Sequence, residues 1–469
     1  AHGGGELNRT LGLFSLVMLG VGATIGTGIF FAMAEAVPKA GPAVIWSFVL
    51  AGVAAALTAL CYAELASTIP ASGSAYSYTY VTIGEFVAYI VGACLLLEYA
   101  LAASATSIGW SEYLNNFLTN AFGVSIPEAL RSPMLVRGDA GLEIHSGNIN
   151  LPPIILVTMC CFLLLRGTKE SATINAVMVL IKVAILVFFA AVAFTAFNAE
   201  NFTPFAPFGF SSVDADGNKL GIVAAAGTIF FSFIGLDTVA TAGAEVKNPK
   251  RNVPLGILLA LVIVVLAYIA VAVAAMGAQP AAQFADQEAG LAAILENVTG
   301  AKWPAVLLSA GAVISVFSVT LVTIYGQTRI LFAIGRDGLI PKTFKSVNPK
   351  TLTPVANTVI VCLVVGLIGG FVDSGYLWDM VSMGTLVAFS LVSIGVTVYR
   401  YKAPNAERGF KLPFGAWLIP MLSVAVCLFI IQDLPGETFT VFFTWMAIVI
   451  AAYFVYGFHK SNLANKEGK

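Results

Sequence analysis

Long apolar segments alternate with short polar ones along the whole chain. Each apolar segment has about 20 residues, the length at which an α-helix crosses the hydrocarbon core of a bilayer. The period-two alternation of a membrane β-strand is absent from these segments. The pattern therefore predicts an all-α polytopic membrane protein with twelve transmembrane helices. They are expected at residues 13–36, 42–65, 84–117, 151–166, 173–197, 220–245, 253–277, 303–334, 354–372, 376–400, 413–432 and 437–458.

Small and polar residues interrupt the first of these segments at mid-depth. The stretch from Gly22 to Phe30 contains three glycines, Gly22, Gly26 and Gly28, and two threonines, Thr24 and Thr27. Such residues weaken a helix where no water can replace the lost hydrogen bonds, and the break is tolerated where it lines a polar cavity. In transporters this cavity is commonly the substrate site. The second half-helix, beginning near Thr27, would direct its N-terminus at a carboxylate or another anion.

The sixth apolar segment carries a similar interruption between Gly227 and Asp237. An offset of five spans gives the two segments opposite topology, so spans 1–5 and 6–10 are predicted to form an inverted repeat with discontinuous helices 1 and 6. The expected divisions are a cytoplasmic N-terminus (1–12), the first repeat (13–197), the second repeat (220–400), spans 11 and 12 (413–458) and a cytoplasmic C-terminus (459–469).

Composition and charge agree with this plan. The chain has 469 residues, of which 58% are hydrophobic and 10% charged, whereas soluble domains carry roughly 25% charged residues. With the N-terminus in the cytoplasm, 18 lysines and arginines fall inside, Arg329 among them, and 5 fall outside. This bias predicts a multi-pass protein of the cell membrane with both termini cytoplasmic.

Several kinds of chemistry have no candidate residues. His2, His145 and His459 lie near the termini or in a loop, so no metal site is predicted. No phosphate-binding glycine loop occurs, which argues against an ATP-driven pump, and no nucleophile–base pair suggests an enzyme. No cofactor is expected apart from a coupling proton. The expected partners are the substrate, membrane lipid and, as one option, a small membrane accessory subunit, without nucleic acid.

Lys182 is the most informative charged residue, because apolar residues flank it on both sides within the fifth span. A charge at the bilayer centre costs at least ~3 kcal/mol on insertion scales. Burial favours the uncharged amine, so such a lysine can load and release a proton. Its ammonium could also replace a bound cation against unwound carbonyls. The alternative is a structural lysine that pairs with carbonyls and never titrates.

Two acidic residues are also predicted inside the membrane. Glu98 lies deep in the third span, and Asp237 follows the break of the sixth. Ionisable residues at such depth are candidate functional residues. They could receive a cationic substrate side chain. Alternatively, Glu98 is a structural or gating partner for a helix dipole or for Lys182, and Asp237 belongs to a gate.

Taken together, these pieces resemble the amino acid–polyamine–organocation (APC) family, and among its members the bacterial proton-coupled relatives of the cationic amino acid transporters. The resemblance rests on Gly22–Phe30, Phe231–Asp237, Glu245–Pro254, Tyr325–Arg329 and Gly335–Gly338, and it covers residues 7–460. It implies the five-plus-five inverted fold of the sodium-coupled leucine transporter. It also implies that Lys182 occupies the place of a sodium ion.

The resemblance further implies where a substrate binds. Its carboxylate would bind the N–H groups of Thr27 and Gly28, and its amino group would donate to carbonyls at Thr24, Phe231 and Ile234. Glu98 and Asp237 match acidic positions of the cationic branch, and Thr323 matches a position where a small residue leaves room for a long side chain. The expected substrate site comprises Thr24, Ile25, Gly26, Thr27, Gly28, Phe231, Ser232, Ile234, Asp237, Glu98 and Thr323.

The function expected is therefore secondary active, proton-coupled transport of L-amino acids by alternating access. Arginine, lysine and ornithine would be favoured, with neutral alanine-like substrates also carried. The nearest alternative is an amino acid or polyamine exchanger without net proton movement. A non-transporting amino acid sensor is a second alternative, and a membrane enzyme a third.

Overall fold

The computed structural model describes residues 7–69, 71, 73–138, 141–215, 219–285, 290–373, 377–431 and 436–467. Most of the described chain is helical, and each predicted span contains at least one helix. The first six predicted spans contain α1 (Leu13–Thr24) with α2 (Thr27–Ala40), α3 (Val44–Thr68), α5 (Glu85–Phe122), α6 (Leu151–Arg166), α7 (Thr168–Phe194), and α8 (Ile222–Ile229) with α9 (Thr238–Thr241).

The other predicted spans contain α10 (Pro249–Ala278), α12 (Trp303–Arg336), α13 (Val355–Phe371), α14 (Trp378–Lys402), α15 (Leu418–Ile431) and α16 (Gly436–Ala452). After α16 the chain continues through a π-helical turn at Tyr453–Gly457 into α17 (Phe458–Lys460) and α18 (Asn462–Glu467). Among the described residues, seven helices are long and apolar enough to cross a membrane, and four more apolar helices have 10–17 residues. The count of twelve spans and the inverted repeat remain predictions.

Both expected helix breaks are present. Between α1 and α2, Ile25 adopts extended backbone angles (φ −78°, ψ 100°), so the helical hydrogen bonding stops at Thr24 and resumes at Thr27. In the sixth span, α8 gives way to a 3₁₀ turn at Phe230–Phe233, and Gly235 takes φ +129° before α9 begins. That φ value is readily available only to glycine.

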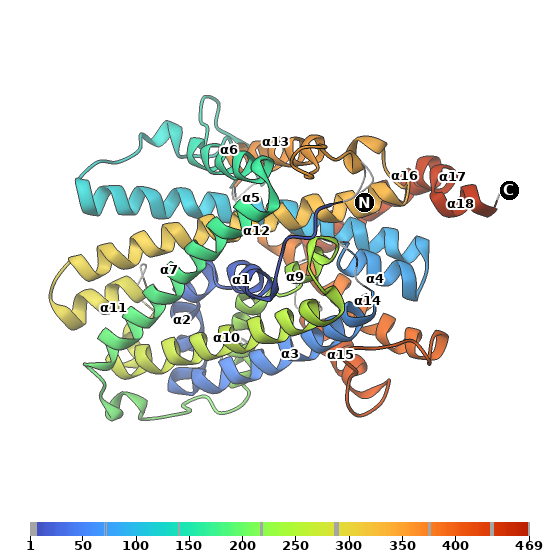
Figure 1. Cartoon of the computed structure of the whole chain (residues 1–469). Coiled ribbons are helices and arrows are strands. Elements are labelled where there is room, and N and C mark those ends of the chain that lie inside the picture. The colour runs from blue at the N-terminus through green and yellow to red at the C-terminus, as the bar shows by residue number, and fades with distance from the viewer. Residues whose placement is uncertain are drawn as a thin grey trace.

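The long helices pack in pairs around α1 (Figure 1). Helix α10 runs beside α3, α12 beside α5, and α6 beside α13. Helix α1 contacts α7, α10 and α12, so it is enclosed by helices from both predicted repeats. Buried residues of these helices form a hydrophobic core that extends from Leu11 to Tyr453. This enclosure positions the first break inside the protein and away from lipid.

The connecting segments contain secondary structure that hydropathy did not predict. Short helices α4 (Ala75–Thr82) and α11 (Gly290–Thr299) occupy two of them. Two connections each contain an antiparallel pair of strands. Between α5 and α6, β1 (Leu135–Gly138) pairs with β2 (Gly141–Ile144), and between α7 and α8, β3 (Ser212–Val213) pairs with β4 (Lys219–Leu220). These elements are too polar or too short to show the long apolar run from which the spans were recognised.

Candidate substrate and coupling site

The two helix breaks pack directly against each other. A Cβ atom at Gly235 would lie 2.6 Å from the carbonyl oxygen of Ala23, so only glycine permits this approach. A Cβ atom at Gly28 would lie 2.9 Å from Ser232 Oγ. The N-terminus of α2 therefore adjoins the 3₁₀ turn of the sixth span, which brings the residues expected to hold the substrate's carboxylate and amino groups into one region.

Lys182 reaches the first break from α7. Its Nζ atom donates to the carbonyl oxygens of Gly22 at 3.0 Å and Ile25 at 2.5 Å, and the side chain is 0% exposed. These carbonyls lack their helical partners because α1 ends at Thr24. The Lys182 side chain thus ties the end of α1 to α7 through two buried hydrogen bonds.

Asn175 provides a second tie two helical turns before Lys182. Its Nδ2 donates to the Met18 carbonyl of α1 at 3.2 Å, and its Oδ1 accepts from Ser318 Oγ of α12 at 2.9 Å. A Cβ atom at Gly22 would lie 2.8 Å from this same Oδ1. One amide thereby joins α1, α7 and α12, and the small residue at Gly22 allows the close contact.

The two predicted intramembrane acids lie on the other side of the sixth span. Asp237 Oδ2 accepts from the Tyr99 hydroxyl at 2.7 Å, and Glu98 is the residue before Tyr99 on α5. Both side chains are buried. Within the described part of the chain, Glu98 Oε2 and Asp237 Oδ1 have no hydrogen-bond partner. Each acid therefore keeps one buried oxygen for a ligand or a water.

A small cavity adjoins Asp237. It has a volume of about 20 Å³ and is bordered by Asp237 and by Tyr62, whose hydroxyl also lacks a partner among the described residues. A volume of this size holds about one water. The remaining walls are mostly apolar and include Phe233 of the 3₁₀ turn and Phe389 of α14, with Thr58 of α3 as a polar member.

A buried ion pair lies near the residues that precede α1. Arg329 Nε lies 2.5 Å from Glu245 Oε1, and the two side chains are 1% and 0% exposed. Arg329 Nη2 also donates to Thr168 Oγ1 at 2.9 Å, Thr168 donates to Glu245 Oε2, and the Tyr325 hydroxyl donates to Glu245 Oε1 at 2.8 Å. We call these four residues the Glu245 network. It joins α7 and α12 to the chain after α9.

The N-terminal segment is bound to the same network through its backbone. The N–H groups of Thr10 and Leu11 donate to the Glu245 carbonyl oxygen, both at 3.0 Å. Arg9 adds hydrogen bonds to the carbonyls of Gly243 and Val246 at 3.2 and 3.0 Å. The start of α1 is therefore held by the turn that contains Glu245.

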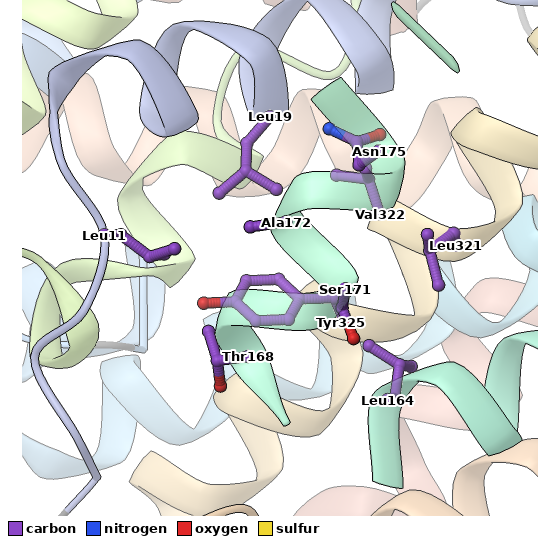
Figure 2. A pocket seen from close by; sticks show the side chains of 10 residues that line it. All are labelled: Leu11, Leu19, Leu164, Thr168, Ser171, Ala172, Asn175, Leu321, Val322 and Tyr325. Carbon is purple, nitrogen blue, oxygen red and sulfur yellow. The ribbon is translucent and has the colours of Figure 1, made fainter. Parts of the chain in front are cut away.

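An apolar cavity of about 10 Å³ lies between Asn175 and the Glu245 network. Figure 2 shows Asn175 and Leu19 at one end, Thr168 at the other, and the Tyr325 ring between them. This volume is at the lower limit for a single water. Packed side chains therefore fill most of the space between Asn175 and the Glu245 network.

Other predicted site residues have their hydrogen bonds satisfied within their own helices. Thr24 Oγ1 donates to the Gly20 carbonyl at 2.7 Å, and Thr323 Oγ1 donates to the Val319 carbonyl at 2.7 Å. Ile25 is buried, and Gly26 packs against Val319, from which its Cβ position is 2.6 Å. Ile234 follows the 3₁₀ turn and is half-buried. The side chains of Thr27 and Phe231 lie outside the described residues.

The sequence analysis counted Arg329 among the cytoplasmic charges and predicted no partner for it. The residue lies inside α12 and is paired with Glu245. Removing it from the count of positive charges leaves the predicted bias almost unchanged. The pairing escaped detection because the two residues are 84 positions apart in the chain.

A second buried pair was also missed. Glu64 in α3 is 1% exposed and forms a salt bridge with Arg400 at the end of α14. Glu64 Oε1 additionally accepts from the backbone N–H of Leu412 at 3.0 Å. Glu64 stood at the edge of a predicted span, so its burial had no signal in the hydropathy pattern.

The comparisons with known proteins cover nearly the whole chain. The sequence model described as "Amino acid permease" matches residues 11–456. The chain belongs to the amino acid permease family. This membership confirms the family that the sequence motifs suggested, and it makes the chain a multi-pass membrane transporter and not an enzyme.

Individual permeases and transporters are similar over comparable lengths. The chain is 40% identical to the branched-chain amino acid permease BcaP of Bacillus subtilis (strain 168), over 98% of this chain and 95% of that protein. It is also 40% identical to the methylthioribose transporter of the same organism, over 98% and 96%. The vacuolar cationic amino acid transporter 2 of Arabidopsis thaliana is 36% identical over 86% of this chain and 62% of its own length.

Proposed function

We propose that this permease carries L-amino acids by alternating access and couples their movement to protons through Lys182. The contact of its ammonium with the carbonyls of Gly22 and Ile25 supports the proposal most strongly. A protonated amine satisfies both carbonyls, whereas the neutral amine has fewer hydrogens and no charge. Loss of the proton therefore weakens the tie between α1 and α7, and α1 becomes free to move.

In the proposed binding mode, the two breaks receive the polar end of the substrate. The carboxylate binds N–H groups at the start of α2, near Thr27 and Gly28, where the helix dipole favours an anion. The α-ammonium binds carbonyl oxygens of the breaks, including that of Thr24. The substrate side chain extends toward Thr323 and the acid pair of Glu98 and Asp237.

The acid pair favours a cationic side chain, because each carboxyl group has one buried oxygen without a partner among the described residues. A guanidinium or ammonium group would satisfy both oxygens and relieve the repulsion between two negative charges. A second candidate is a branched-chain amino acid. The 40% identity to a branched-chain amino acid permease favours this alternative, since the cationic transporter compared above is 36% identical.

The alternating movement would carry the first, second, sixth and seventh predicted spans as a bundle against the third, fourth, eighth and ninth. Both termini are proposed to lie in the cytoplasm, on the side of the Glu245 network. This network would then be the inner gate, and the described conformation would be closed toward the cytoplasm. A small membrane accessory subunit is compatible with this arrangement, and no part of the cycle requires one.

Uptake into proteoliposomes tests the proposal. Radiolabelled arginine, leucine and alanine would be supplied with and without an inward proton gradient, to the native protein, to Lys182→Met and to Lys169→Met. Lys169 lies on the same helix but is exposed, so it serves as the matched control. We expect gradient-driven uptake by the native and Lys169→Met proteins, and uptake without stimulation or none by Lys182→Met.

The same experiment separates the alternatives. Uptake that needs internal amino acid, ignores the gradient and survives Lys182→Met would establish an exchanger and refute proton coupling. The ratio of arginine to leucine uptake by the native protein decides between the two substrate classes. A ratio below one would show that the acid pair does not select the side chain.

A further inference from the structure

Tyr268 of α10 connects the two helix breaks through a single hydroxyl group. Its Oη lies 2.9 Å from the carbonyl oxygen of Thr24, at the end of α1, and 2.7 Å from that of Ser232, in the 3₁₀ turn. All three residues are buried. No sequence argument selected Tyr268, because one tyrosine in a long apolar helix has no distinguishing pattern.

The ring of Tyr268 is fixed by aromatic neighbours on two sides. Phe233 lies edge-on to it at a centroid distance of 5.0 Å, and Phe48 of α3 does the same at 6.2 Å. Edge-to-face pairs in this distance range are attractive and orient both rings. The hydroxyl therefore cannot turn away from the two carbonyls without repacking α3, α10 and the 3₁₀ turn.

The hydroxyl has one hydrogen but two carbonyl oxygens within hydrogen-bond distance. It can donate to only one of them at a time. The other carbonyl then faces an oxygen lone pair and lacks a donor from Tyr268. A buried carbonyl in this state favours any additional N–H donor that enters the site.

We propose that Tyr268 is a positioning residue for the substrate's α-ammonium group. The hydroxyl lies between the carbonyl oxygens of Thr24 and Ser232 and donates its single hydrogen to one of them. The other carbonyl oxygen receives no hydrogen bond from Tyr268. When an ammonium group donates to the Thr24 carbonyl, the hydroxyl donates fully to Ser232, and both carbonyls are satisfied. Substrate binding thereby completes a hydrogen-bond set that links three predicted spans, the first, sixth and seventh.

This inference rests on the proposed function, since it assumes that an amino acid binds between the breaks. The variant Tyr268→Phe removes only the hydroxyl and keeps the ring between Phe48 and Phe233. Tyr78→Phe is the matched control, because Tyr78 is equally buried and its hydroxyl has no hydrogen-bond partner within the described part of the chain. Gel filtration of both purified variants would verify that they are folded.

The decisive measurement is affinity for two ligands with the same side chain. One is the amino acid that the native protein transports best, and the other is its 2-hydroxy acid analogue, which has no ammonium group. Calorimetry would give the dissociation constant of each ligand for the native protein and both variants. We expect Tyr268→Phe to bind the amino acid about tenfold more weakly, the effect of losing one hydrogen bond of ordinary strength.

The hydroxy acid should bind Tyr268→Phe and the native protein with nearly equal affinity, and Tyr78→Phe should match the native protein for both ligands. Equal weakening of both ligands by Tyr268→Phe would reduce Tyr268 to a structural role and overturn the inference. Unchanged or tighter binding of the amino acid would overturn it as well. If the native protein transported no amino acid at all, the proposed function would itself be refuted, which the other outcomes leave intact.

Discussion

Removing Arg329 should destabilise the protein far more than removing Arg329 and Glu245 together. The single variant Arg329→Met leaves the Glu245 carboxylate buried at 0% exposure without its ion-pair partner. Breaking a buried pair on one side costs about 3–5 kcal/mol, whereas replacing both charges by neutral groups is often nearly without cost. The double variant with Glu245→Gln keeps an acceptor for Tyr325 and carries no unpaired charge.

The remaining contacts of Arg329 set the size of the effect in the double variant. The guanidinium donates to Thr168 and lies 4.4 Å from the centroid of the Tyr325 ring. A cation above a desolvated ring contributes up to about 2 kcal/mol, and one neutral hydrogen bond about 1 kcal/mol. We therefore expect a loss of about 4 kcal/mol in the single variant and about 2 kcal/mol in the double variant.

Reversible unfolding in mixed micelles, titrated with a denaturing detergent, would measure these free energies in a double-variant cycle. Arg336→Met is the control, since Arg336 ends the same helix and is exposed; changes at such surface positions stay within about 0.5 kcal/mol. The cycle also includes Glu245→Gln alone, and the coupling energy is the sum of the two single losses minus the loss in the double variant. A coupling energy of at least about 2 kcal/mol between Arg329 and Glu245 is expected. A coupling energy near zero would refute the reasoning, because it would mean that the network is hydrated and the charges do not depend on each other.

Two further outcomes follow from the geometry. Gly235→Ala should abolish uptake, because Gly235 has φ +129° and the added Cβ would lie 2.6 Å from the Ala23 carbonyl; Gly415→Ala, with φ +85° and open space, should transport normally. Asp337, which follows α12 and accepts from Tyr76, has its pKa raised from 3.8, chiefly by burial and further by the charge of Glu85. Deprotonation of this carboxyl group therefore lowers the stability of the native protein as the pH rises above 3.8. The melting temperature of Asp337→Asn, measured relative to that of the native protein, should accordingly increase from pH 4 to pH 8. A constant difference would contradict this.

The sequence predicted those parts of the fold that depend on local composition. Apolar length located the spans, and the glycines around Gly26 and Gly235 located both breaks, because glycine weakens a helix and a break in hydrocarbon is tolerated only where protein or a polar cavity surrounds it. Lys182 was recognisable for a similar reason, since a charge in an apolar stretch has few explanations. Each of these signals is contained within a single apolar segment of about 20 residues.

The remaining features depend on residues that are distant in the chain. The Arg329–Glu245 and Glu64–Arg400 pairs join positions 84 and 336 residues apart. Glu245 stood beside a loop rich in charge, and Arg329 stood near a helix end, so each had an ordinary solvated interpretation. The proposed role of Tyr268 depends on the two carbonyl oxygens that the fold places beside its hydroxyl. A single sequence contains no information on such convergence.

The position of Lys182 on α7 bears on how a proton could control a whole helix. Helix α1 is held at three levels, by Lys182 at Gly22 and Ile25, by Asn175 at Met18, and by the Glu245 carbonyl at its start. In the proposed cycle only the lysine changes charge, because an amide does not titrate. Release of the proton therefore loosens the end of α1 at the substrate and leaves its other end attached.

Full opening then requires the Glu245 network to separate as well. Thr168 and Lys182 lie fourteen residues apart on α7, a distance of about 21 Å along the helix, so the two events are spatially distinct. A protein that needs both is protected against proton leak, since deprotonation alone does not open the closed route between them. The cavity beside Tyr325 supports this requirement, because its volume is at the lower limit for a single water in the described conformation. In the proposed cycle, water enters this region only after α1 has moved away from α7 and α12.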